Sequence, residues 1–76
     1  MKVFITVKDK TVPVYSDEVN YKKKLTLLKS AIESKLVQGR QAIKTCLDTL
    51  ISIEIIGSEA ILHSINERHT LALSLY

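Results

Sequence analysis

Several residue types are scarce in this 76-residue chain, and each scarcity excludes a class of protein. Cys46 is the single cysteine, so no disulfide can form within the chain. The two histidines, His63 and His69, make no CxxC or HxxxH pattern with it, so no structural metal site is expected. Two glycines and one proline leave no low-complexity segment. The hydrophobic core must therefore stabilise the fold by itself.

Long hydrophobic runs are also missing. No segment approaches the roughly 20 apolar residues of a membrane-spanning helix. The first eight residues hold too short an apolar stretch for a signal peptide. A lone, unpaired cysteine is typical of a reducing compartment. We therefore expect an intracellular, cytoplasmic protein that does not bind a membrane.

The remaining composition is that of one compact domain. Hydrophobic residues make up 46% of the chain and charged residues 25%, which are ordinary values for a globular protein. The length predicts a single domain over residues 1–76. A chain this short buries only about 60% of its unfolded surface, so its margin of stability is thin unless a partner helps.

The start of the chain predicts a β-hairpin. Residues 2–8 and residues 11–15 each follow the period of two that a strand requires, and the polar pair Asp9-Lys10 separates them. Pro13 cannot donate a hydrogen bond to a neighbouring strand, so we expect the second strand to lie at an edge of the sheet. Ser16-Asp17 then favours the start of a helix.

The middle of the chain has helical spacing. Apolar residues three or four positions apart fall on one helical face, and they are Leu25, Leu28, Ile32 and Leu36. The spacing resumes after Gly39 with Ala42, Ile43, Cys46, Leu47 and Leu50. Gly39 either ends the first helix or lies within one long helix, at a cost of about 1 kcal/mol relative to alanine. The sequence fits both arrangements.

The last third favours strands. Residues 50–56 are rich in branched apolar side chains, and the Gly-Ser pair after them indicates a turn. Residues 60–65 fit a short strand or an irregular helical turn, and residues 66–69 form a polar break. The strict alternation of residues 70–76 predicts a half-buried closing strand. The expected fold class is α+β.

Three stretches together resemble ubiquitin and its β-grasp relatives. Residues 1–5, Met-Lys-Val-Phe-Ile, are similar to the start of that family, and Lys10-Thr11 begins the second strand as it does there. The helical segment 25–35 carries three apolar anchors at the family's spacing, with a lysine directly after the second. Ile65, followed five residues later by Thr70-Leu71, resembles the family's approach to its last strand.

The resemblance implies a β-grasp fold, a mixed sheet packed on a central helix. Residues 38–50 depart from it, because a helix-like run stands where ubiquitin has a proline-containing loop. Conjugation to other proteins is not expected, because it needs a flexible Gly-Gly tail and the two glycines of this sequence are not adjacent. The apolar receptor patch is also not expected, because Ser74 and Asp9-Lys10 stand at its positions, and Glu67 replaces a chain-linkage lysine. The resemblance therefore implies a non-conjugated ubiquitin-like protein.

We expect no enzyme activity, no cofactor and no small-molecule substrate. Nothing in the sequence orients a base toward Cys46, which we interpret as a buried, inert thiol on a helix. The two histidines are interpreted as surface or rim residues. Glu54 and Glu59 flank a turn and could suggest a pair of catalytic carboxylates. A chain this short leaves little room for a substrate cleft, so we interpret both as solvated surface residues. Nucleotide-binding, zinc-protease and serine-hydrolase motifs are absent.

Two binding functions from different classes remain. The first is a non-covalent protein-interaction module that docks through a sheet edge. Its candidate contacts are Val14, Tyr15 and Tyr21, because edge strands accept further strands and tyrosine is a frequent anchor of interfaces. Ordinary packing within the hairpin is the alternative interpretation of these three residues.

The second is RNA binding by a small basic protein in a ribonucleoprotein such as the ribosome. Residues 1–44 hold ten basic and four acidic residues, whereas residues 45–76 hold one and four. The candidate phosphate contacts are Lys22, Lys23, Lys24, Lys29, Arg40 and Lys44. These residues are also typical of a solvated helix face. Burial in a larger assembly or self-association is a third alternative, because residues 51–56 are apolar on both faces.

Overall fold

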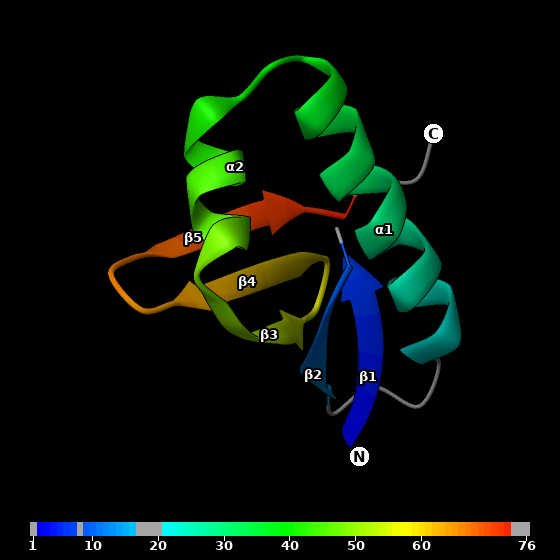
Figure 1. Cartoon of the computed structure of the whole chain (residues 1–76). Coiled ribbons are helices and arrows are strands. Elements are labelled where there is room, and N and C mark those ends of the chain that lie inside the picture. The colour runs from blue at the N-terminus through cyan, green and yellow to red at the C-terminus, as the bar shows by residue number, and fades with distance from the viewer. Residues whose placement is uncertain (1, 8, 17–20, 74–76) are drawn as a thin grey trace.

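The computed structural model describes residues 2–7, 9–16 and 21–73 (Figure 1). Over these ranges the elements are β1 (Lys2–Val7), β2 (Lys10–Ser16), α1 (Tyr21–Val37), α2 (Gln41–Asp48), β3 (Leu50–Ile56), β4 (Glu59–Ser64) and β5 (Arg68–Ala72). The predicted α+β class and the predicted hairpin are confirmed. Neither described helix combines the length and the apolar character that crossing a membrane requires.

The five strands form one mixed sheet in the order β1-β2-β3-β4-β5. Neighbours are antiparallel except for the central pair, β2 and β3, which run parallel. A parallel pair needs a connection of about a dozen residues or more to return the chain to the same end of the sheet. Here α1 and α2 provide this connection and lie on the same side of the sheet (Figure 1). Their buried side chains belong to the same core cluster as those of the strands.

The expectation that Pro13 marks an edge strand is wrong. β2 lies between β1 and β3, so β1 and β5 are the edges of the sheet. Pro13 is opposite Phe4 of β1, while the pairs with β3 begin one residue later, at Val14. Pro13 therefore precedes the parallel ladder with β3. No residue of β3 is paired with it, so its lack of an N–H group removes no hydrogen bond from that ladder.

Gly39 ends α1, which decides between the two helical arrangements. Its φ angle is +72°, in the left-handed region that glycine adopts without strain. The Gly39 N–H donates to the Leu36 carbonyl over 3.0 Å, and the Arg40 N–H donates to the Lys35 carbonyl over 3.2 Å. These bonds satisfy carbonyls at the helix end, and α2 begins at Gln41. The proposed helix-start residue Asp17 lies outside the described ranges.

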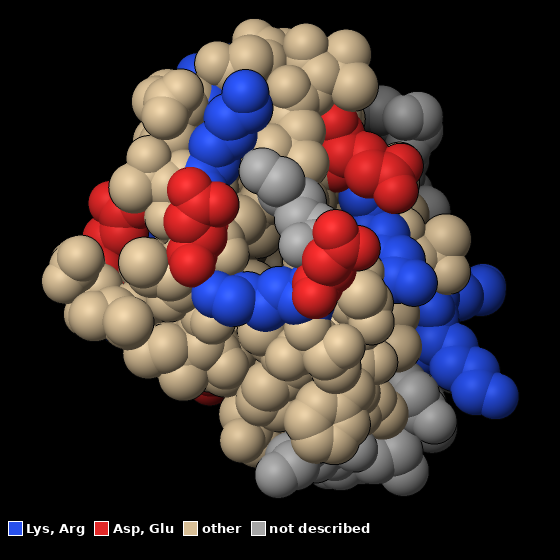
Figure 2. Space-filling view, in the orientation of Figure 1, with Lys and Arg blue, Asp and Glu red and all other residues tan. Residues whose placement is uncertain are grey.

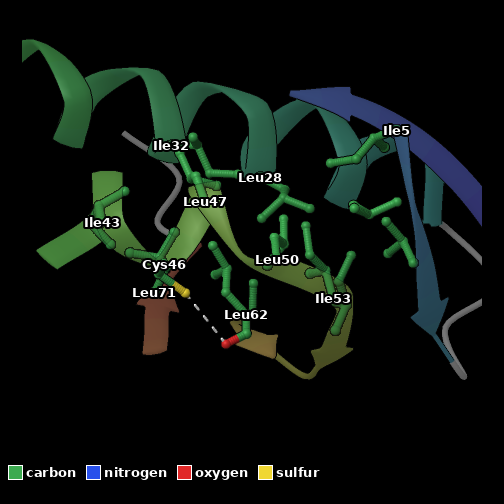
Figure 3. Packing of buried hydrophobic residues seen from close by; sticks show 14 of the residues in the cluster. Ile5, Leu28, Ile32, Ile43, Cys46, Leu47, Leu50, Ile53, Leu62 and Leu71 are labelled. Atoms are coloured by element: carbon green, nitrogen blue, oxygen red, sulfur yellow. Dashed lines mark hydrogen bonds between the residues drawn. The ribbon is translucent and has the colours of Figure 1, made fainter. Parts of the chain in front are cut away.

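The core lies between the helices and one face of the sheet. The register places Val14, Ile53 and Leu62 side by side on three strands, and each is 0% exposed. The predicted apolar stripe of α1 is confirmed, because Leu28 and Ile32 are buried at its centre. From α2 the buried residues are Ile43, Cys46 and Leu47 (Figure 3). This layer fixes which face of every strand points inward.

The last two strands lie close to the predicted ranges. Residues 59–64 form β4, so the segment for which the sequence allowed a strand or a helical turn is a strand. β5 starts at Arg68, two residues before the predicted alternation, so the last two residues of the expected polar break belong to a strand. His69 is the register partner of Leu62, and this pairing extends the strand backwards. Residues 74–76 of the predicted closing strand lie outside the described ranges.

Candidate functional site

The strand register defines the residues on the other face of the sheet. Tyr15, Glu54, Ile61 and Thr70 stand side by side on β2, β3, β4 and β5. Residues directly opposite each other share a face, and this row alternates with the buried row of the core. It therefore points away from α1 and α2. We call this surface, which neither described helix covers, the open face.

Large apolar side chains are exposed on the open face. Phe4 is 59% exposed, Tyr15 45% and Ile56 52%. Phe4 is opposite Pro13, and Tyr15 follows Pro13 by two residues, so the two aromatic residues are diagonal neighbours on one face. Ile56 shares that face because it follows Glu54 by two residues in β3. Exposed apolar side chains gathered on one face are typical of a contact surface.

The polar groups between these side chains bind one another. His63 Nε2 and Glu54 Oε1 are 3.0 Å apart, and both side chains are partly exposed. The hydroxyls of Thr6 and Thr11 are 3.1 Å apart across β1 and β2. Such cross-strand pairs satisfy their own hydrogen-bonding needs, so burying them under a partner costs less than burying single polar groups. The sequence predicts Glu54 as solvated surface. The structure shows instead a half-buried carboxylate that is paired with His63.

The predicted protein-binding residues have different environments. Val14 is 0% exposed in the interior row, so it cannot touch a partner while the protein is folded. Tyr15 lies on the open face rather than at a sheet edge. Tyr21 begins α1, and its side chain lies outside the described part of the chain. Sequence reasoning missed Phe4, although Phe4 occupies an outward position in the alternation of the first strand.

The predicted phosphate contacts do not share one surface. Four of them lie on α1, while Arg40 and Lys44 lie at and after the start of α2. Successive helical residues are rotated by about 100°, so Lys22 and Lys29 point the same way while the other two α1 lysines do not. Figure 2 shows that basic and acidic side chains alternate on the visible face. The basic residues thus form small separate groups rather than one continuous basic surface.

Cys46 is buried, as the sequence predicts. It is 0% exposed, and its thiol donates to the Leu62 carbonyl oxygen over 3.8 Å (Figure 3). Burial raises the pKa of the Cys46 thiol, while a hydrogen bond from the Ser64 side chain opposes this and the Glu67 carboxylate adds to it. The reactive thiolate is therefore disfavoured in the folded protein.

The raised pKa of Cys46 predicts a loss of stability in mild alkali. The folded thiol keeps its proton to higher pH than the unfolded thiol, whose pKa is about 8.5. The stabilising contribution is therefore complete below that pH and falls as pH rises through the folded pKa. Between pH 7 and pH 9.5, wild type should lose more free energy of unfolding than Cys46→Ala in urea titrations. Parallel losses in the two proteins would contradict this account.

The histidines lie at the rim of the fold, as predicted. The side chains of His63 and His69 are 33% and 30% exposed. His69 Nε2 is 3.8 Å from Glu67 Oε1. Among the residues that the structure describes, no group of three or more His, Cys, Asp and Glu side chains is arranged to hold a metal ion.

The open face is suited to recognition of another surface. It combines rings that gain free energy when buried with polar pairs that are already hydrogen-bonded to each other. Apolar side chains on β1, β2 and β3 are interspersed on it with the Thr6–Thr11 and His63–Glu54 pairs. Comparison of the chain with protein-family models, with curated proteins and with solved structures found no match in any of the three.

Proposed function

We propose that this chain is a non-enzymatic protein-interaction module that binds its partner through the open face. The observation that carries the proposal is the exposure of Phe4, Tyr15 and Ile56 on one face of a sheet whose other face carries the hydrophobic core. Aromatic side chains contribute most of the binding energy in many protein interfaces. The lone cysteine supports an intracellular place of action, where it stays reduced.

The ubiquitin-like, non-conjugated assignment is part of this proposal. An N-terminal hairpin, a long packed helix and a mixed sheet are the features that support it. In this arrangement the interaction module works without covalent attachment to its partner. The surface used is the open face, because the predicted edge beside Pro13 is paired on both sides.

The charges on the open face favour a protein partner over RNA. Glu54 is the register partner of Tyr15, so a carboxylate stands beside the exposed ring. A phosphate backbone following the ring would approach this negative group, which is unfavourable. An apolar protein segment that carries a lysine or arginine gains both ring burial and a contact with Glu54. We therefore propose a partner surface of this chemistry.

Affinity purification with matched variants tests the proposal. Wild type should retain a discrete protein partner after RNase treatment and at high salt, because burial of apolar surface is insensitive to screening. The double variant Phe4→Ser, Tyr15→Ser should lose that partner. Val37→Ser is the control, because Val37 is an 88% exposed apolar residue at the end of α1.

The outcomes separate the two classes of function. A partner that Val37→Ser retains and the double variant loses supports the proposal. Partners that disappear with RNase would instead support the ribonucleoprotein alternative. Equal retention by wild type and the double variant would show that the open face is not the binding surface. Circular dichroism of each variant checks that the fold is intact.

A further inference from the structure

A second surface lies on the helix side of the molecule, beside the edge strand β5. It is a hollow of about 200 Å³ between the end of α1, the start of α2 and β5. Lys35, Arg40 and His69 line it, each from a different one of these segments. Ile43 and Leu71, both 4% exposed, also line the hollow and belong to the core, so this part of the wall is fixed.

The backbone brings the three residues to one corner of the fold. The hydrogen bond from the Arg40 N–H to the Lys35 carbonyl closes the corner between the helices. His69 is the register partner of Leu62, which belongs to the buried row, so His69 lies on the helix-covered side of β5. Residues far apart in the sequence are therefore brought to one place by packed elements.

The charge of this hollow distinguishes it from two others of similar size. The hollow beside β1 pairs Lys29 with Glu33 in its lining. The hollow between α1 and Ala72 has Lys35 as its charged lining residue. The hollow at Arg40 has two permanent cations and a histidine in its lining, and an acidic group, Glu67, lies outside the lining with its Oε1 3.8 Å from His69 Nε2. An anion in the hollow would be attracted by both cations.

We propose that this hollow binds a phosphate group, as free inorganic phosphate or as the terminal phosphate of a small molecule. Guanidinium groups bind phosphate oxygens through paired hydrogen bonds, and lysine adds a point charge. A volume of about 200 Å³ is below the roughly 300–1,000 Å³ of pockets that enclose a whole drug-sized ligand. The hollow therefore holds one compact anionic group with the rest of any ligand outside.

Titration with inorganic phosphate at constant ionic strength, followed by ¹H–¹⁵N spectra, tests the proposal. Wild type should show saturable shifts at the amides of Lys35, Arg40 and His69. Arg40→Gln should raise the dissociation constant about tenfold, which is the loss of one charge-assisted hydrogen bond. Lys44→Gln removes the same charge from α2, at a position outside the hollow lining, and should change the constant less than about twofold.

Three results would overturn the proposal. The first is the absence of saturable shifts at these amides. The second is an equal weakening by Arg40→Gln and Lys44→Gln, which would indicate diffuse charge attraction. The third is a short RNA shifting the same amides when inorganic phosphate does not. Phe4→Ser, Tyr15→Ser should bind phosphate like wild type, so this test is independent of the open face.

Discussion

Ile53→Ala is expected to lower the free energy of unfolding by about 2–5 kcal/mol, because it removes buried methyl groups and leaves a cavity. Ile53 is 0% exposed and joins the two halves of the sheet, since its register partners are Val14 on β2 and Leu62 on β4. A domain of this length has about 4–11 kcal/mol of total stability. Urea denaturation followed by circular dichroism should therefore show a large shift of the midpoint or loss of the folded state.

The same strand provides the control for this prediction. Ile51 is an isoleucine two residues earlier in β3, at the register shift between Leu50 and Ser52, so the regular alternation does not turn it inward and it is 55% exposed. Ile51→Ala should cost less than about 1 kcal/mol, because surface substitutions remove few packed contacts. Losses of equal size at the two positions would show that β3 does not have the described inward and outward faces.

Gly39→Val is expected to lower the free energy of unfolding by about 1–2 kcal/mol, the cost of a left-handed conformation for a residue with a side chain. The cost comes from the backbone, because a Cβ atom at Gly39 would meet no atom within 4 Å. The φ angle of +72° is required by the tight corner between α1 and α2. Thermal and urea denaturation measure the loss.

Asparagine distinguishes backbone strain from other effects at this corner. Gly39→Asn should retain most of the stability, because asparagine enters the left-handed region more readily than other residues with side chains. Equal destabilisation by valine and asparagine would argue against the strain explanation. Gln38→Val, at an exposed neighbouring position, should change stability by less than about 0.5 kcal/mol.

The candidate site shows where sequence reasoning succeeds and fails. Tyr15 could be selected because an aromatic residue in an alternating strand is a frequent anchor. The sequence predicts Val14, its neighbour, as a contact as well, because it does not say which side of the strand a helix will cover. Phe4 alternates with the inward residues Val3 and Ile5, so the sequence places it on the outward side, but nothing in the sequence shows that this side stays uncovered. The burial of Val14 and the exposure of Phe4 follow from one fact, the side on which α1 packs.

The basic residues illustrate a second limit. A run of lysines is visible in the sequence as a group, yet the helix turns Lys22, Lys23 and Lys24 in different directions. In contrast, Lys35 and His69 have nothing in common in the sequence, and the fold places both in one hollow. Charge clusters on a folded surface depend on side-chain direction and on long-range contacts more than on order along the chain.

The sequence by itself determined the local elements, because their causes are local. The period of two predicted the hairpin and the closing strand, branched apolar residues predicted the strand over 50–56, and the spacing of Leu28 and Ile32 predicted the inner face of α1. Only the tertiary structure decided the order of the strands, the interior place of β2 and the identity of the open face. These depend on the parallel pairing of Val14 with Ile53, which are distant in the chain. Such pairing is selected by the packing of the whole core, and no short pattern encodes it.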